Sequence, residues 1–402
     1  MDRKYRYRAK NVHDLQGEGL LVRLWSADGP ANRKEIERVF QPLARTGFVH
    51  PYVALMPDWH PGEDAVVGSV VPTRDMLLPQ VIGGDIGCGM CAVRLPVSAH
   101  DLKPLFAVIA SGLREAIPVG SAQNAVVTQR VKDNPLWQRE LRASISDRTF
   151  RKLIRQFGSL GGGNHFLELQ ADQDGRAWIM LHSGSRYLGV EVRDHYVEAG
   201  RTQDGVDPKL YKRIPHLRAE STLGVEYFQD VQAVRDFARE SRREMLLRAL
   251  DVVQREVPAL DVAGIAGQAA DVGHNYVSLE EHFGERLYVH RKGAIHLAKG
   301  TIGFVPGSMG SSSYVVEGRG TEAAFCSSAH GGGRAMSRAA ASRTITQRQL
   351  MERMEGIVCV HDGVLLDEAP DAYKDIRSVM RGQGDLVKIL HELTPLVSLK
   401  GR

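Results

Sequence analysis

The spacing of apolar residues predicts several helices in this 402-residue chain. In residues 33–46, Ile36, Val39, Phe40 and Leu43 recur at intervals of three and four, so they share one face of a helix. The longest helical pattern covers residues 226–256 and ends before Pro258. Shorter helices are expected over residues 101–116, 336–355 and 383–394.

Short apolar runs between Gly and Pro predict strands and loops elsewhere. This pattern covers residues 64–96 and 287–330, and strands are also expected over 357–366. Between residues 163 and 182, two strand-like runs flank the polar turn Ala171–Gly175. We therefore expect a β-hairpin there, with a histidine at each end.

Residues 129–155 are polar and hold many cations, namely Arg130, Lys132, Arg139, Arg142, Arg148, Arg151, Lys152 and Arg155. Two interpretations stay open for this segment. It is either a solvated helical face or part of a surface that binds phosphates.

Composition and charge are those of an ordinary globular protein. The net charge of +4 permits an anionic partner but does not demand one. Four cysteines in a chain of this size do not form a disulfide framework, so we expect free thiols and a reducing compartment. The N-terminus lacks a secretory signal and no apolar run is long enough for a membrane helix, so we expect a cytoplasmic protein without a membrane partner.

The segment Gly84–Met90 carries the first candidate chemistry. It sets the Asp85 carboxylate and the Cys88 thiol three residues apart in a glycine-rich run that cannot be a regular helix. A hard oxygen beside a soft sulfur suits a borderline divalent transition metal. The chain adds four histidines that abut Gly, Asn or Ser, a setting in which backbone can wrap an ion or a phosphate: His165, His182, His274 and His330.

Other motifs leave alternatives open. Cys88 and Cys91 form a Cys-x-x-Cys, but no second pair follows, so we interpret Cys91 as a strand residue. His330-Gly-Gly-Gly333 is similar to the oxyanion loop of some lipases, but no Gly-x-Ser-x-Gly elbow accompanies it. Residues 306–314 form either a plain turn or a nest for phosphate. There is no Walker A sequence and no Lys-x-Asp-Gly.

Taken in order, the motifs of this chain resemble the RtcB family of RNA-splicing ligases almost from end to end. The matching segments are Met56–Gly62, Gly68–Thr73, Gly84–Met90, Gly158–Glu168, Leu181–Arg186, His274–Val277, Arg291–Ala294, Pro306–Gly310, His330–Arg334 with Ser337-Arg338, Ala372–Ile376 and Leu399–Gly401. The resemblance implies an α+β fold over residues 1–402, a single RtcB-like domain with central β-sheets flanked by helices and a metal-lined active-site cleft.

The resemblance also implies roles for individual residues. A two-metal site, usually holding Mn²⁺ with Cys88 as the bridge, would be formed by Asp85, Cys88, His165, His182 and His274. His330 would be the nucleophile that takes GMP from GTP. Nucleotide contacts would come from Asn164, His165, Glu168, His274, Asn275, Pro306, Gly307, Ser308, Met309, Ser313, His330, Gly331, Gly332, Gly333 and Lys400. Four cations beside these positions are suited to RNA phosphates, namely Arg186, Lys292, Arg334 and Arg338.

The implied activity is a GTP- and Mn²⁺-dependent RNA ligase that serves tRNA splicing or RNA repair. It joins a 3′-phosphate or 2′,3′-cyclic phosphate end to a 5′-hydroxyl end through a guanylylated histidine. Two alternatives remain, a metal-dependent cyclic-phosphate hydrolase or phosphatase that does not ligate, and a noncatalytic RNA-binding protein. Whether an activating protein partner is needed stays open.

The chain departs from the usual pattern of the family at a few positions. Trp59 stands where an aliphatic residue is common, and Gly332 replaces an alanine. Glu63 and Asp64 add negative charge near the expected RNA path. None of these positions is an expected metal ligand or the expected nucleophile, so the departures bear on substrate preference rather than on chemistry.

Overall fold

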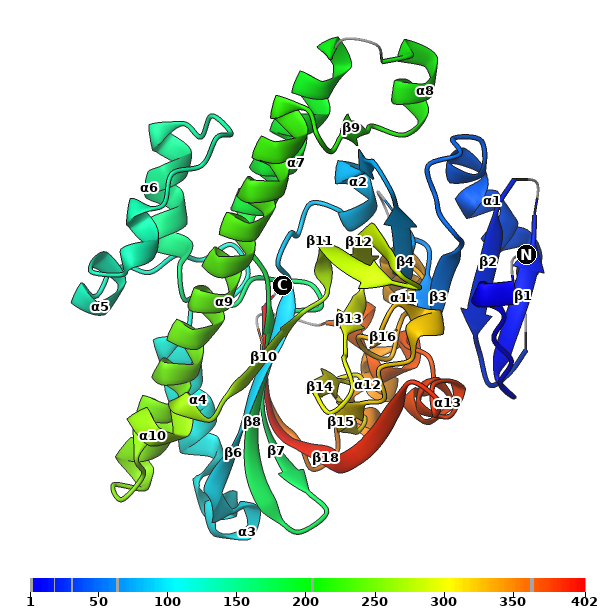
Figure 1. The fold of residues 1–402 in the computed structure, drawn as a ribbon. Coiled ribbons are helices and arrows are strands. Elements are labelled where there is room, and N and C mark those ends of the chain that lie inside the picture. The colour runs from blue at the N-terminus through cyan, green and yellow to red at the C-terminus, as the bar shows by residue number, and fades with distance from the viewer. Residues whose placement is uncertain are drawn as a thin grey trace.

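Two β-sheets form the centre of the molecule, with helices on their outer faces (Figure 1). The computed structural model describes residues 3–17, 19–29, 32–62, 65–203, 206–361 and 365–401. Glu63 and Asp64 lie outside these residues. The fold is α+β, as the sequence resemblance implies. No helix in the described ranges is long and apolar enough to cross a membrane.

The first sheet has the strand order β1-β2-β3-β4-β12-β11, in which only β2 and β3 run parallel. Its strands are β1 (Val12–Gln16), β2 (Leu21–Trp25), β3 (Val53–His60), β4 (Val67–Thr73), β11 (Asn275–His282) and β12 (Glu285–Lys292). Helix α1 (Arg33–Ala44) packs Ile36, Phe40 and Leu43 against this sheet, as the apolar spacing predicts.

The second sheet has the order β10-β6-β8-β7-β18-β15-β14, and β17 pairs with β18. Its strands are β6 (Gly89–Ser98), β7 (Phe166–Asp172), β8 (Arg176–Ser183), β10 (Ala270–Gly273), β14 (Ile302–Val305), β15 (Ser313–Gly318), β17 (Val358–His361) and β18 (Val387–Lys400). Two short pairs accompany the sheets, β5 (Met76–Leu77) with β9 (Leu217–Arg218) and β13 (Ala294–His296) with β16 (Ser327–Ala329).

The expected hairpin is present as the antiparallel pair β7 and β8. The expected long helix is α9 (Thr222–Glu256), which crosses one face of the second sheet with α4 and α10 (Figure 1). The remaining helices are α2 (Pro79–Ile82), α3 (Ala99–Leu102), α4 (Phe106–Ala116), α5 (Gln129–Lys132), α6 (Asp147–Gln156), α7 (Tyr187–Ala199), α8 (Pro208–Arg213), α10 (Val262–Gly267), α11 (Arg338–Thr344), α12 (Gln347–Arg353) and α13 (Ile376–Gly382).

Three secondary-structure predictions were wrong. The expected helix over residues 383–394 is a turn up to residue 386 and then strand β18, which lies in the interior of the sheet between β7 and β15. The expected helix over 336–355 is two helices, because Thr346 caps α12 and so separates it from α11. The run Pro79–Ile82 is a short helix rather than a strand, with Pro79 in its first turn. Strand 357–366 is shorter than expected, since β17 ends at His361.

Candidate active site

The register of β6, β7 and β8 aligns the ends of these three neighbouring strands, and three predicted metal ligands lie together there. His182, near the end of β8, pairs with Met90 of β6 and with Phe166 of β7. Cys88 directly precedes β6 and His165 directly precedes β7, so both come to lie beside His182. The Sγ atom of Cys88 is 3.1 Å from Nε2 of His182 and 3.4 Å from Nε2 of His165.

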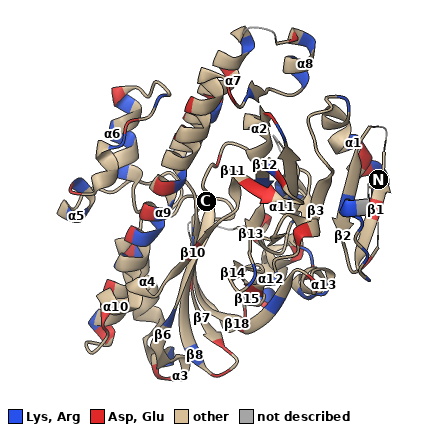
Figure 2. Cartoon of the chain, viewed as in Figure 1, with Lys and Arg blue, Asp and Glu red and all other residues tan. Residues whose placement is uncertain are grey.

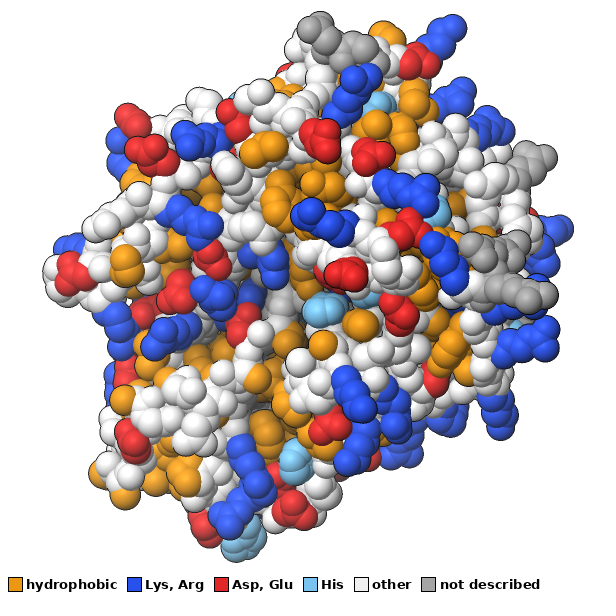
Figure 3. All heavy atoms as spheres, viewed as in Figure 1, with side chains coloured by type: hydrophobic (Ala, Val, Ile, Leu, Met, Phe, Trp, Pro, Cys, Tyr) orange, Lys and Arg blue, Asp and Glu red, His pale blue; other side chains and the backbone are white. Residues whose placement is uncertain are grey.

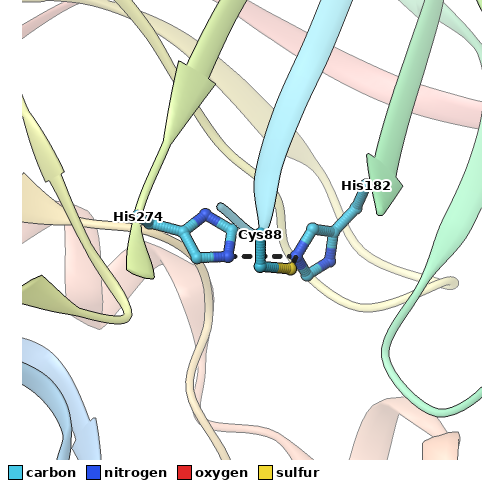
Figure 4. A group of neighbouring side chains, drawn as sticks. All are labelled: Cys88, His182 and His274. Atoms are coloured by element: carbon cyan, nitrogen blue, oxygen red, sulfur yellow. Dashed lines mark hydrogen bonds between the residues drawn. The ribbon is translucent and has the colours of Figure 1, made fainter. Parts of the chain in front are cut away.

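The other two predicted ligands complete this cluster. His274 lies between β10 and β11, where the chain passes from the second sheet to the first, and its Nε2 is 3.2 Å from that of His182. Figure 4 shows both imidazole rings beside the Cys88 thiol. The Asp85 carboxylate lies 3.1 Å from Nε2 of His165. Five side chains from four segments of the chain therefore lie together.

The donor atoms form two groups that share one sulfur. Cys88, His182 and His274 make one group, and Asp85, Cys88 and His165 make the other, with all donor atoms of a group within 4.8 Å of one another. The buried Oδ1 of Asp85 finds no hydrogen-bond partner in the described part of the chain. A buried carboxylate oxygen without a partner is costly unless a cation satisfies it. Sulfur, imidazole and carboxylate donors fit two borderline divalent metals bridged by a thiolate.

The protonation of these groups suits metal binding. Burial lowers the pKa of His182 and His274 well below the usual range, so both imidazoles are neutral. Burial opposes ionisation of Asp85, but the hydrogen bond and charge interaction with His165, together with Cys88 and Lys292, outweigh it and hold the pKa of Asp85 below its usual value. Burial raises the pKa of the Cys88 thiol well above its usual value. A metal that binds here must therefore displace a proton from Cys88.

Arg242 of α9 holds the strand ends that carry the ligands. Its fully buried guanidinium donates to the carbonyls of Gly87 and Ser183, both at 2.8 Å, and forms a bidentate pair with Asp271 of β10. These contacts join the ends of β6, β8 and β10. The sequence analysis did not single out Arg242, because its partners are far from it in the chain.

His330 follows β16 and is oriented by a carboxylate of the first sheet. Its Nδ1 lies 2.7 Å from Oδ2 of Asp58 in β3, and its backbone N–H donates to the same oxygen. With Nδ1–H donating to Asp58, Nε2 keeps its lone pair. The ring centroid of His330 is 4.7 Å from that of His274. Asp58 was missed as a functional residue, although it lies in the Met56–Gly62 segment that resembles the family.

A cavity of about 930 Å³ opens over this cluster. Pro306, Gly307 and Ser308 lie on its wall, so the 306–314 loop is next to the ligands. Gly333 has a φ of +68°, and a Cβ there would collide with the backbone of Asp58. Of the predicted site residues, all but His165 and Arg186 line the cavity, namely Asp85, Cys88, Asn164, Glu168, His182, His274, Asn275, Lys292, Pro306, Gly307, Ser308, Met309, Ser313, His330, Gly331, Gly332, Gly333, Arg334, Arg338 and Lys400.

Two buried carboxylates lie in this region: Glu168 lines the cavity, and Glu368 is bonded to Lys400 and Tyr373, which line it. Glu168 accepts hydrogen bonds from Gln170 at 2.6 Å and from Ser398 at 3.0 Å. Burial raises the pKa of Glu168 to about 7. Glu368, which the sequence analysis missed, accepts from Lys400 at 2.5 Å and from the Tyr373 hydroxyl at 2.7 Å.

The side-chain amide of Asn275, a predicted nucleotide contact, forms hydrogen bonds within the protein. Its Nδ2 donates to the carbonyl of Asp85 at 3.1 Å, and its Oδ1 accepts from the backbone of Gly293 at 2.8 Å. The amide thus fixes the loop that carries Asp85 next to the end of β12.

The four predicted RNA-binding cations have different surroundings. Arg334 is nearly buried and donates to Glu368 and to the carbonyls of Met336 and Asp367. Arg338 pairs with Asp367 and Glu368, but its side chain is 44% exposed. Arg186 donates to the carbonyl of Gly120 and lies outside the cavity wall. Lys292 lies on the wall, close enough to Asp85 and Cys88 to act on both electrostatically.

Comparison with known proteins agrees with this arrangement. The family described as tRNA-splicing ligase RtcB matches residues 40–401. The chain is 33% identical to the RNA-splicing ligase RtcB of Escherichia coli K12, over 97% of this chain and 100% of that protein. It is 26% identical to the tRNA-splicing ligase RtcB of Thermococcus kodakarensis, over 94% of each chain, and 28% identical to that of Archaeoglobus fulgidus, over 86% and 87%. The chain therefore belongs to the RtcB family.

Proposed function

We propose that this protein is a GTP- and Mn²⁺-dependent RNA ligase that joins a 3′-phosphate or 2′,3′-cyclic phosphate end to a 5′-hydroxyl end. The names of its relatives, RNA-splicing and tRNA-splicing ligases, support RNA joining as the reaction. The observation that carries the proposal is the position of His330 beside two groups of metal-ligand side chains that share Cys88.

In the proposed first step, Nε2 of His330 attacks the α-phosphorus of GTP. A nitrogen–phosphorus bond forms, the bond to the β-phosphate oxygen breaks, and pyrophosphate leaves. Asp58 supports this step because it holds Nδ1–H and keeps the lone pair on Nε2.

In the following steps, an oxygen of the RNA 3′-phosphate attacks the GMP phosphorus and releases His330. The 5′-hydroxyl of the second RNA then attacks the 3′-phosphate, a 3′–5′ phosphodiester forms, and GMP leaves. Before these steps, water attacks the phosphorus of a 2′,3′-cyclic phosphate, the bond to O2′ breaks, and a 3′-phosphate and a 2′-hydroxyl result. Bound divalent metals would neutralise charge on the phosphate oxygens and favour in-line attack. Lys292, on the cavity wall, is placed to bind a further phosphate oxygen.

The proposed nucleotide site lies toward Glu168 and Lys400. A carboxylate that accepts two parallel N–H groups distinguishes guanine from adenine, and Glu168 is a buried carboxylate on the cavity wall. The loop at Pro306–Ser308 and the glycines after His330 offer backbone N–H groups to phosphates. These contacts support GTP as the nucleotide.

The test is a joining assay with two RNA fragments, one ending in a 3′-phosphate and one beginning with a 5′-hydroxyl. We expect joining only when both GTP and Mn²⁺ are present. Release of inorganic phosphate, or opening of a cyclic phosphate without joining, would favour the hydrolase instead. RNA retention that depends on neither GTP nor metal, with no change in the RNA, would favour a noncatalytic binding protein.

A further inference from the structure

The N-terminal half of α7 connects the cavity to a cationic face of α6. Arg148, Arg151, Lys152 and Arg155 recur along α6 at intervals of three and four, so they share one face of the helix. We call these four residues the α6 stripe. All four are exposed, and Figure 2 shows Lys and Arg along this helix. Like charges at this spacing repel one another and destabilise a helix.

The charge of the α6 stripe is not balanced within the protein. Asp147 at the helix start is the single carboxylate of α6. Arg148, Arg151 and Arg155 form no ion pair with any described residue, whereas the nearby Arg130 and Arg139 pair with Glu244 and Asp236. Helix α6 alone holds four Lys and Arg against one Asp, a surplus of three positive charges.

An exposed aromatic ring lies beside the α6 stripe. Tyr187 is 43% exposed, and the Nζ atom of Lys152 lies 4.7 Å from the centroid of its ring. In the space-filling view, cationic and hydrophobic side chains mix over the region of α5 and α6 (Figure 3). Cations that bind phosphates and rings that stack on bases are the combination by which proteins hold single-stranded nucleic acid.

The path from the α6 stripe to the cavity is short. Tyr187 begins α7, and Val190 and Arg193 of the same helix line the cavity. Tyr187 follows Arg186, which packs against Gly161 in the loop that carries His165. We propose that the α6 stripe and Tyr187 bind the single-stranded RNA that leads away from the end being joined. This proposal rests on the proposed ligase function for the identity of its ligand.

The test measures RNA binding by the full-length protein without GTP, so that no reaction follows. Two RNAs that end in a 3′-phosphate are compared, one so short that it occupies only the cavity and one extended by further nucleotides. We expect the longer RNA to bind more tightly. Substitution of Arg148, Arg151 and Arg155 by Ala should weaken binding of the longer RNA by about tenfold and lower its salt slope by about 2, since each phosphate contact contributes about 0.7.

Control variants separate a specific path from overall charge. Lys10 just before β1, Lys103 just after α3 and Lys388 in β18 are exposed cations, and these elements lie away from α6 (Figure 1). Their combined substitution by Ala should leave the affinity and the salt slope for the longer RNA unchanged. Tyr187→Ala should weaken binding of the longer RNA about fivefold or more through lost stacking, while Tyr187→Phe should retain it.

Two outcomes would overturn the proposal. One is equal affinity of the longer RNA for the wild-type protein and the triple α6 variant. The other is an equal loss in the control triple variant, which would indicate nonspecific attraction. Labelling of the enzyme by GTP, measured without RNA, should be normal in every variant. If the wild-type protein fails to label, the ligase proposal fails, but the RNA comparison still decides whether the α6 stripe binds RNA.

Discussion

At the scale of single residues, the site depends on side chains that orient other side chains. His330 is held by the Asp58 carboxylate at both Nδ1 and the backbone N–H. Orientation of a histidine by a carboxylate fixes which ring nitrogen carries the proton. In the proposed reaction this leaves Nε2 as the nucleophile, so the rate of guanylylation depends on a residue that touches neither RNA nor nucleotide.

We expect Asp58→Asn to slow guanylylation of the enzyme by about 100-fold or more, because loss of an orienting carboxylate costs up to about 10⁴-fold in other histidine-dependent sites. Metal content, measured by elemental analysis, should not change, because Asp58 forms no hydrogen bond or ion pair with the five predicted ligands in the described part of the chain. Normal labelling in this variant would show that His330 does not need Asp58. A parallel loss of bound metal would instead indicate a role in the fold.

Glu168 should make nucleotide binding sensitive to pH. Burial raises its pKa to about 7, so the carboxyl takes up a proton as the pH falls through that value and loses acceptor capacity. We therefore expect GTP affinity, measured by calorimetry, to decrease below about pH 7. Glu168→Gln should bind GTP about tenfold more weakly or worse at high pH and should lose this pH dependence. An unchanged pH profile in that variant would contradict the assignment.

The sequence identified ligands better than it identified orienting residues. Asp85, Cys88 and the histidines were visible because their types and glycine-rich surroundings suit metal binding, and the structure brings them together. Asp58 bonds a histidine 272 residues away, Arg242 donates to a backbone carbonyl 155 residues away, and Glu368 pairs with a lysine 32 residues away. No local pattern predicts such contacts, since they exist only after the chain has folded.

At the scale of elements, the position of a residue relative to the end of its strand determines whether its side chain reaches the metal-ligand cluster. Cys88 lies just outside β6, whereas Cys91 lies within it and packs in the apolar core among α4, α9 and α10. The two thiols are three residues apart but point to different surroundings. The interpretation of Cys91 as a strand residue is confirmed.

This difference predicts opposite results for two substitutions. Cys88→Ser should weaken Mn²⁺ binding by more than about 100-fold. Removal of a residue that only hydrogen-bonds to a metal ligand lowers metal affinity by about 10–100-fold, and loss of a ligand itself should exceed this. The same substitution should also abolish the proton release that accompanies metal binding, which calorimetry in two buffers measures. Cys91→Ala should leave both nearly unchanged. Equal effects of the two substitutions would mean that the thiols act as one Cys-x-x-Cys site.

Elements with strong local patterns were predicted well, and those fixed by long-range pairing were not. The β7–β8 hairpin and α9 followed from the sequence. Residues 387–400 form a strand because they pair on one side with β7 and on the other with β15. Their short apolar runs fit a helix equally well, and only these distant partners decide between the two.

At the scale of the whole molecule, the cavity gathers segments from His60 at the end of β3 to Lys400 at the end of β18. Metal ligands, nucleophile and proposed nucleotide contacts share this space, and the proposed RNA path leaves it along α7. Nucleotide transfer to the enzyme and joining of RNA should therefore be separable by substitutions at different parts of the wall.

Arg338 provides such a substitution. It lies at the start of α11 and is 44% exposed on the cavity side, where it can reach a phosphate of the RNA. We expect Arg338→Ala to reduce joining by about tenfold or more and to reduce guanylylation much less, because GMP transfer to His330 needs no RNA. Guanylylation and RNA joining are assayed side by side, and the loss in joining is compared with the loss in guanylylation. An equal reduction would assign Arg338 to the nucleotide site or, through Asp367 and Glu368, to the fold.

The central claim is that His330 carries GMP between GTP and RNA. The most direct measurement is incubation of the protein with Mn²⁺ and GTP labelled at the α-phosphate, followed by detection of labelled protein. We predict one adduct on His330 that is acid-labile and alkali-stable, as expected of a phosphoramidate. His330→Ala should abolish it while metal content is retained. Labelling that persists in His330→Ala, or no labelling of a metal-loaded wild-type protein, would contradict the claim.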